Sequence, residues 1–361
     1  MNRNYEYYTN FNWLQNPFTL KISPQLMVGY SSQTNTLLSH IFNSHKIALV
    51  IGHTGSGKTT MITWINDFIN NSDKSFQSYY IPKPPRSKED LISLFKFLFG
   101  FTIVDNFRFK NLSTQNLSKF LVNKTMKKKT VVLIDEAHES SIEVLEWLRT
   151  LTDIIPNLLI VFAGLPVFEE KMNTELPTLA MRITTKVNLE SLNFVETESL
   201  VRKRIEDVGG KGLEPFTSDS MKRVFEISGG FPREVIKLCD KLIEQSSKEN
   251  ISTINETFVN QIFTSSKKTQ KIIQSHEDTK ILISEKQRTI LEILDKKTKL
   301  SPSEIVENLE QSSYKNKNNA IRSVNNILRR LMRDELIIRQ KMGSRYVYSL
   351  SGKAKSIFAD A

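Results

Sequence analysis

The sequence predicts an α/β domain built on a parallel sheet, then a helical region, then a small C-terminal module of three helices and a β-hairpin. Short apolar runs at 46–51, 130–134 and 158–163 alternate with helical patterns, as is typical of a parallel sheet with both faces covered. From about residue 190 the pattern becomes wholly helical. A polar stretch rich in Lys, Ser and Gln at 265–283 precedes a new periodic segment, and it indicates a linker.

These patterns divide the 361 residues into four segments: an α/β domain at 1–189, a helical region at 190–264, a linker at 265–283 and a C-terminal module at 284–361. Cys239, the only cysteine, excludes an internal disulfide and a zinc site of the CxxC type, and it fits a reducing compartment. We therefore expect a cytoplasmic protein. No apolar run approaches the length of a membrane span, so we expect no membrane partner.

Periodicity places the individual elements of the first two segments. Residues 88–99, for example, carry Leu91, Leu94, Phe95 and Leu98 on one helical face. The expected α/β elements are helix 32–43, strand 46–51, helix 58–70, strand 77–81, helix 88–99, strand 130–134, helix 141–151 and strand 158–163. The clearest helices that follow are 196–208, 217–228 and 232–247.

The turn between strand 46–51 and helix 58–70 reads GHTGSGKT at residues 52–59, a full match to G-x-x-x-x-G-K-[ST] between a strand and a helix. Glycines let successive backbone N–H groups converge on phosphate oxygens, and the helix presents its positive end to the same anion. We expect ATP to bind here. Lys58 would contact its β- and γ-phosphates, and Thr59 would ligate Mg²⁺. The expected nucleotide contacts are Gly52, Thr54, Gly55, Ser56, Gly57, Lys58, Thr59 and Thr60.

Apolar strand 130–134 ends in Asp135-Glu136, which supplies the second half of this site. At the carboxyl end of a buried strand, Asp135 would lie beside the Mg²⁺ ion. Glu136 would then orient and deprotonate the attacking water. An Asp-Glu pair after a strand is often only a solvated loop, but the complete phosphate-binding motif upstream favours a catalytic role for both residues.

The C-terminal module begins with a helix at 284–297. A second helix is expected to start at Ser301, which would be its N-cap. Pro302 would lie in its first turn and Glu304 at its third position. A third helix spans about 316–333, with Ala320, Val324, Ile327 and Leu331 as its buried stripe. Residues 335–351 alternate as two strands around Gly343. Three helices and a hairpin describe a winged helix.

Positive charge concentrates in this module. Residues 265–361 carry a net charge of +9, against +2 for the first 264 residues, and 315–345 alone carry +7. A helix that bears Asn and Arg can enter the major groove of double-stranded DNA, and hairpin cations can contact phosphate. The alternative is an Arg-rich helix that makes only protein contacts. The expected DNA contacts are Lys315, Asn319, Arg322, Asn326, Arg329, Arg333, Lys341 and Arg345.

Over residues 10–260 the chain resembles AAA+ ATPases. The segments that carry the resemblance are 27–30 (MVGY), the phosphate-binding turn with Asp135-Glu136, 158–172, 181–210 and 227–243. The sequence of these core segments most resembles the ExeA/TniB/MuB-like group of secretion-accessory and transposition proteins. The order of domains resembles that of replication initiators and branch-migration motors.

The resemblance implies further site residues. Val28 would flank the adenine. Arg182 matches the arginine that projects toward a neighbouring subunit's γ-phosphate, and Arg233 matches the lid arginine that senses the γ-phosphate within its own chain; for each, the alternative is a surface ion pair. Arg204 is a weaker candidate, expected on a solvated helix face. Leu165 stands where the family has a polar sensor residue, which implies slow hydrolysis.

We therefore expect an ATPase that uses ATP and Mg²⁺, forms a homo-oligomer, binds double-stranded DNA and associates with the nucleoid. Its nucleotide would control assembly or grip on DNA, in replication initiation and loading or in transposition-target selection with a recruited protein partner. Two alternatives stay open. One is a nucleotide-switched DNA-binding regulator with very slow hydrolysis, and the other is a signalling ATPase whose winged helix makes only protein contacts.

Overall fold

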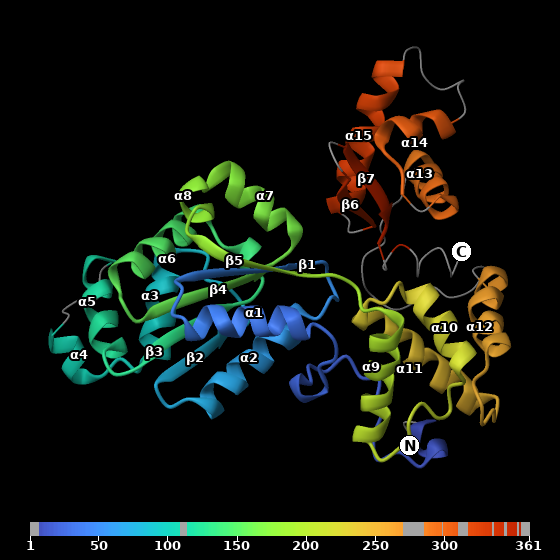
Figure 1. Ribbon diagram of the computed structural model, residues 1–361, viewed down its shortest axis with the longest axis horizontal. Coiled ribbons are helices and arrows are strands. Elements are labelled where there is room, and N and C mark those ends of the chain that lie inside the picture. Colours follow the sequence, from blue (N-terminus) through green and yellow to red (C-terminus); the bar gives the residue numbers. More distant parts are fainter. Residues whose placement is uncertain are drawn as a thin grey trace. The chain divides into compact units, whose positions relative to one another are not determined.

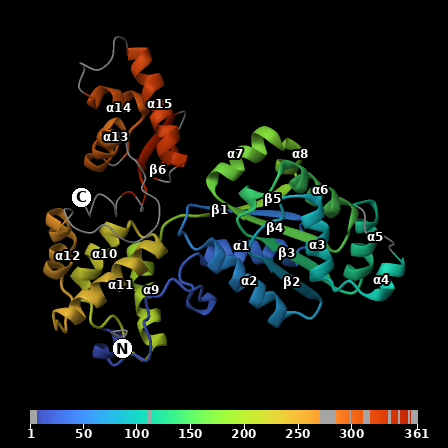
Figure 2. The same ribbon diagram turned by 180° about the vertical axis from the view of Figure 1, so that it is seen from behind.

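A computed structural model describes residues 7–108, 114–269, 285–297, 299–309, 317–333, 336–342, 345–351 and 354. The chain divides into two compact units (Figures 1 and 2). Lys21–Glu190 forms one of them, and Met1–Leu20 joins Ser191–Ala361 in the other. The first residues therefore belong with the helical region, whereas the sequence patterns place them in the α/β domain 1–189. No helix within the described ranges combines the length and apolar character needed to cross a membrane.

The unit Lys21–Glu190 is an α/β fold around a parallel five-stranded sheet in its described part, with the order β2-β3-β4-β1-β5. The strands are β1 (Ile47–Gly52), β2 (Phe76–Ile81), β3 (Lys129–Ile134), β4 (Leu158–Gly164) and β5 (Ile183–Leu189). The helices are α1 (Ser31–Phe42), α2 (Lys58–Ser72), α3 (Lys88–Leu98), α4 (Ile103–Arg108), α5 (Thr114–Thr125), α6 (Ile142–Ile154), α7 (Pro166–Glu175) and α8 (Pro177–Ala180), with short 3₁₀ turns η2 (Pro24–Leu26) and η3 (Ala137–Glu139).

The central strands are apolar because helices cover both faces of the sheet. Ile47, Leu49 and Ile51 of β1 pack into one core with α3, α5 and α6, while the alternate residues Ala48 and Val50 are buried on the other face. Figure 1 shows α1 and α2 on the side of the sheet away from α6. Because the strands are parallel, the carboxyl ends of β1, β3 and β4 lie at the same end of this buried sheet, and the candidate site lies there.

The helical region, which we call the lid, consists of α9 (Phe194–Asp207), α10 (Ser218–Ser228), α11 (Pro232–Lys248) and α12 (Glu256–Thr269). The sequence had placed the end of this region at residue 264, but α12 continues to Thr269. The N-terminal segment 7–20, which begins with η1 (Tyr7–Phe11), packs against these helices. Trp13 and Phe18 are 5% and 1% exposed, and the Phe18 ring contacts Phe216 edge-on at a centroid distance of 5.9 Å.

The C-terminal module has the three helices and hairpin that its sequence predicts. They are α13 (Glu285–Lys296), α14 (Pro302–Asn308), α15 (Lys317–Arg333), β6 (Ile337–Met342) and β7 (Arg345–Leu350). Ser301 and Glu304 form a capping box at the start of α14, and an isolated bridge pairs Leu300 with Tyr348 beside the hairpin. On α15 the buried stripe contains Leu328 rather than the predicted Ile327, which is only partly buried against the core.

Candidate functional site

The turn between β1 and α2 has a backbone that only glycine adopts without strain. Gly55 and Gly57 have φ angles of +80° and +95°, in the left-handed region. At Gly52 the obstacle is space, because a Cβ there would lie 2.4 Å from Ser56 Oγ and 3.0 Å from the Leu189 carbonyl oxygen. The glycines of the motif thus form a tight loop that leads directly into the N-terminus of α2 at Lys58.

Lys58 is buried inside this loop, with only 5% of its surface exposed. Its ammonium group donates to the Gly52 carbonyl at 2.8 Å and to the His53 carbonyl at 3.1 Å. Ser56 Oγ is also buried, and it has no hydrogen-bond partner among the described residues. A buried cation and an unsatisfied hydroxyl at a helix N-terminus are well suited to an anion such as a nucleotide phosphate.

Asp135 follows β3 directly and contacts the phosphate-binding turn. Its carboxylate is 2% exposed; Oδ2 accepts a hydrogen bond from Thr59 Oγ1 at 2.6 Å, and Oδ1 accepts one from the Glu136 backbone N–H at 2.9 Å. Hydroxyl and carboxylate oxygens are ligands that Mg²⁺ prefers, and it usually takes one or two protein ligands beside substrate phosphates. The pair therefore fits a nucleotide-bound Mg²⁺. The described residues contain no group of three or more His, Cys, Asp or Glu that could hold a metal ion.

Glu136 adopts a left-handed backbone conformation, with φ of +48° and ψ of +35°. Non-glycine residues rarely adopt this region, and such strain is concentrated at functional sites. The Glu136 side chain is 41% exposed, in contrast to the buried Asp135, and His138 Nδ1 lies 3.4 Å from its Oε2. Glu136 thus presents a carboxylate to solvent directly after the strand that carries Asp135.

Tyr80 is a polar residue of this site that the motifs do not reveal. It lies on β2 opposite Leu133 of β3, and its hydroxyl donates to Asp135 Oδ2 at 3.3 Å. Burial, and then the nearby charge of Asp135, raise the pKa of Tyr80 to about 12, so the phenol stays protonated near neutral pH. Only the strand order and register bring Tyr80 here, so no signal local to its own sequence could identify it.

The other expected nucleotide contacts lie in or beside the same loop. Thr54 is exposed, and Thr60 is partly buried in the first turn of α2. Val28 is partly buried between η2 and α1, and the nearby Tyr30 ring would lie 3.7 Å from a Cβ on Gly57. Leu165 precedes α7 at the end of β4, and its side chain is apolar where the resemblance predicts a polar sensor residue.

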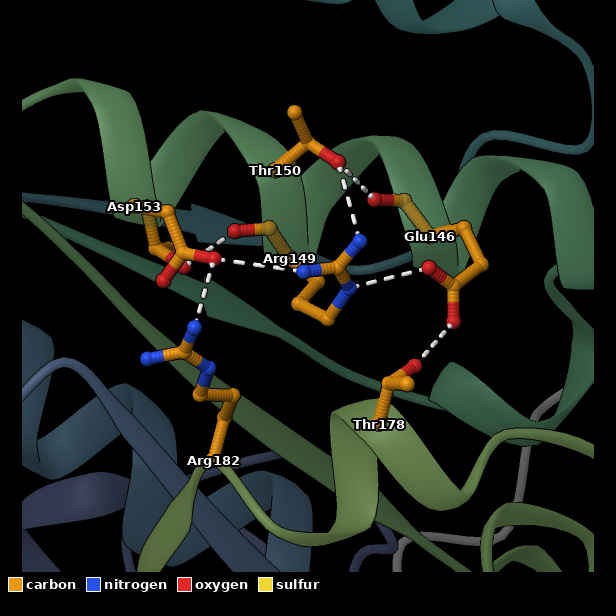
Figure 3. A network of polar contacts seen from close by, with 7 residues as sticks. Glu146, Arg149, Thr150, Asp153, Thr178 and Arg182 are labelled. Atoms are coloured by element: carbon orange, nitrogen blue, oxygen red, sulfur yellow. Dashed lines mark hydrogen bonds and ion pairs between the residues drawn. The ribbon is translucent and has the colours of Figure 1, made fainter.

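Arg182 lies just before β5 and forms an ion pair within its own chain. Its Nη2 is 3.3 Å from Asp153 Oδ2 at the end of α6, and its side chain is 56% exposed (Figure 3). This is the surface ion pair that the sequence left open as the alternative. More than half of the Arg182 side chain stays accessible beside this contact, and its action toward a neighbouring nucleotide stays a prediction.

Two arginines of the lid, Arg233 and Arg204, occupy opposite environments. Arg233 is exposed in the first turn of α11, and its proposed role toward the γ-phosphate stays a prediction. The expectation of a solvated Arg204 is wrong, because this side chain is 7% exposed. Its Nη1 donates to the carbonyl oxygens of Pro17 at 2.8 Å and Thr19 at 3.1 Å. The N-terminal segment covers a helix face that local periodicity assigns to solvent.

The winged helix exposes part of the predicted DNA-binding set. Asn326, Arg329 and Arg345 are exposed, as is the unpredicted Arg330. On the hairpin, Arg339 stacks over the exposed Tyr346 ring at 4.5 Å from its centroid. Lys315 lies outside the described residues, as do the side chains of four further predicted contacts: Asn319, Arg322, Arg333 and Lys341.

Two family models match separate parts of the chain. Residues 42–172 match a family described as "AAA domain", and residues 283–359 match a family described as "Penicillinase repressor". The chain is also 28% identical over 246 residues to general secretion pathway protein A of Aeromonas hydrophila. That alignment covers 65% of this chain but only 44% of the relative, so the chain spans less than half of that protein's length.

Solved structures resemble the fold over nearly the whole chain. The ORC2 protein of Aeropyrum pernix, solved in ADPNP-ADP complexes, has a TM-score of 0.60 at 15% identity, with 96% of each chain covered. The ORC1 protein of the same organism, solved in complex with DNA, has a TM-score of 0.52 at 14% identity, with 95% of each chain covered. At these identities the likeness concerns the fold alone.

Proposed function

Because the chain carries an AAA+ P-loop domain and a C-terminal winged-helix domain, we propose that it is an ATPase that binds double-stranded DNA. We further propose that ATP controls the assembly of its subunits or their grip on DNA. The work would be loading or initiation in replication, or target selection in transposition, with a protein partner recruited to the bound DNA.

The observation that carries this proposal is the 2.6 Å contact of Thr59 with Asp135, made by the residue that directly follows the buried Lys58. Lys58 would hold the β- and γ-phosphates, while Thr59 and Asp135 would hold Mg²⁺. The ion would neutralise phosphate charge when bound. Tyr80 would keep the Asp135 carboxylate oriented.

Glu136 would orient a water molecule and accept its proton as the water oxygen bonds to the γ-phosphorus and the bond to ADP breaks. Two arginines would stabilise charge on the γ-phosphate: Arg233 from the same chain, and Arg182 from a second copy.

DNA binding is supported by the positive charge of the C-terminal module and by the exposed Asn326, Arg329 and Arg345. The similar ORC1 protein was solved with DNA, which agrees with this proposal at the level of the fold. The protein would recognise double-stranded DNA as a polyanion. Contacts to phosphates would position α15, and contacts to bases would add specificity.

The decisive experiment measures how the bound nucleotide changes the affinity for DNA. Duplex DNA affinity is measured between about 50 and 200 mM salt, with ATP or ADP present, for the wild type and for Lys58→Ala. Several phosphate contacts predict a log–log slope of several units, and nucleotide control predicts different affinities with ATP and ADP. Lys58→Ala should lose this difference, whereas Lys127→Ala, which removes an exposed lysine, should keep it.

Two results would contradict the proposal. Absence of DNA binding at the lowest salt would leave a winged helix that makes only protein contacts. An undiminished response of Lys58→Ala to nucleotide would mean that the loop around this lysine is not the controlling site.

Leu165 favours a second candidate, a nucleotide-switched regulator of DNA binding that hydrolyses very slowly. Its side chain has no group that can form a hydrogen bond to water or phosphate at the end of β4. Under this alternative the DNA-binding experiment gives the same result, but DNA leaves ATP turnover near zero.

A further inference from the structure

Asp153, at the end of α6, contacts two guanidinium groups through one carboxylate oxygen. Its Oδ2 lies 3.2 Å from Arg149 Nη1 and 3.3 Å from Arg182 Nη2 (Figure 3). The two arginines differ in exposure, since the Arg149 side chain is 23% exposed and the Arg182 side chain 56% exposed. Asp153 therefore forms ion pairs with the partly buried Arg149 and with the accessible Arg182 at the same time.

Arg149 is held in place independently of Asp153. Its Nε donates to Glu146 Oε2 at 2.9 Å, and Glu146 Oε1 accepts a further hydrogen bond from Thr178 at 2.9 Å. In Figure 3 these contacts fix Arg149 along α6, whereas Arg182 approaches from the strand side and meets the network at Asp153. Arg182 can leave without dismantling the contacts among Arg149, Glu146 and Thr178.

We propose that Asp153 is a positioning residue that stores Arg182 within its own chain and releases it to the nucleotide of a second copy. This inference rests on the proposed action of Arg182 between subunits. Removing one partner of an ion pair is costly when the other charge is left uncompensated. Here Arg149 stays 3.2 Å from Asp153 after Arg182 departs, so the carboxylate keeps a cationic partner.

Lys46 also lies near Asp153: burial lowers the pKa of the Lys46 ammonium group, and the negative charge of Asp153 opposes part of that fall. Its ammonium group is held by the carbonyl oxygens of Ile155 at 2.8 Å and Pro156 at 2.5 Å. Lys46 therefore adds to the field around Asp153 without taking the place of Arg182. Storage depends on the single contact with Arg182, and release depends on Arg149.

The expected strength of storage is modest, because Asp153 and Arg182 are 31% and 56% exposed. Ion pairs of this exposure change an equilibrium by about twofold to fivefold, and salt weakens them. Such a contact can hold Arg182 in a dilute, unassembled chain and still yield to a neighbouring triphosphate. We expect it to bias assembly-dependent hydrolysis rather than to block it.

The test measures ATP turnover per subunit against protein concentration at low salt. Asp153→Asn keeps the size of the side chain but removes its charge, so the half-maximal concentration should fall by about twofold to fivefold. Arg149→Met leaves Arg182 as the remaining guanidinium partner of Asp153, so the midpoint should rise. Glu143→Gln on the same helix, which removes the acid paired with Lys88, should leave the midpoint unchanged.

Each variant is first checked for folding by its thermal melting curve. Arg182→Ala should abolish the concentration-dependent rise, and Asp153→Asn should then have no further effect in that background. If Arg182→Ala keeps the full rise, the proposed action between subunits fails. If Arg182→Ala loses the rise but Asp153→Asn behaves like Glu143→Gln, the storage role of Asp153 is overturned and the proposed function stands.

Discussion

The nucleotide end of the sheet and the exposed face of the winged helix place charge in opposite ways. Lys58 and Asp135 are buried and held by specific hydrogen bonds at 2.6–3.1 Å. Arg329, Arg330 and Arg345 lie exposed on a helix and a hairpin. A buried charge depends on each partner, whereas exposed charges act together through a screened field. We therefore expect single substitutions to be severe at the first region and mild at the second.

The largest effect in the first region is expected at Glu136, because of its proposed chemistry rather than burial, since its side chain is 41% exposed. Glu136→Gln keeps the size of the side chain but removes the proton acceptor, so single-turnover ATP hydrolysis should slow by about 10²- to 10⁴-fold. Nucleotide affinity should stay close to that of the wild type, because Lys58, Thr59 and Asp135 are retained. Glu139→Gln, three residues on and paired with Arg86, is the matched control. Equal rates for Glu136→Gln and the wild type would remove Glu136 from the chemistry.

An intermediate effect is expected at Tyr80. Tyr80→Phe keeps the partly buried ring and removes the hydrogen bond to Asp135, which is worth about 0.5–1.5 kcal/mol. The maximal turnover should fall by about twofold to tenfold, with the Mg²⁺ concentration for half-maximal rate raised. Tyr79→Phe on the same strand serves as control. A fall in melting temperature without a change in Mg²⁺ dependence would reduce Tyr80 to a packing residue.

The smallest effect is expected on the winged helix. Arg329→Ala should cost less than about 1 kcal/mol of DNA affinity and reduce the salt slope by about one unit if the guanidinium contacts a phosphate. Arg288→Ala, on the exposed face of α13, is a control with the same loss of charge. A loss comparable to that of a buried charge would break the contrast, since it would mean that Arg329 is enclosed by the bound DNA.

The same contrast separates what the sequence predicts well from what it does not. The P-loop and the Asp135-Glu136 pair are contiguous motifs beside apolar strands, so composition and order locate them. Tyr80 reaches the site through the pairing of β2 with β3, which no local pattern encodes. Arg204 was assigned to solvent because helical periodicity ignores the N-terminal segment that covers it.

Two further differences between the sequence prediction and the structure concern strand β5 and the buried face of α15. Strand β5 lies at an edge of the sheet and alternates exposed residues with partly buried or buried ones, so it lacks the apolar run that reveals β1, β3 and β4. On α15 both Ile327 and Leu328 are compatible with a helical repeat. Packing against the rest of the module decides between them, because the observed core takes Leu328.

The N-terminal segment gives the chain two covalent crossings between its compact units, at Leu20–Lys21 and at Glu190–Ser191. Arg204, with the buried Trp13 and Phe18, anchors the first crossing to the lid. A unit that is joined to its neighbour by two chain segments has fewer rotational degrees of freedom than one joined by a single segment. Deletion of residues 1–20 would therefore remove one of the two connections together with the packing that buries Trp13 and Phe18.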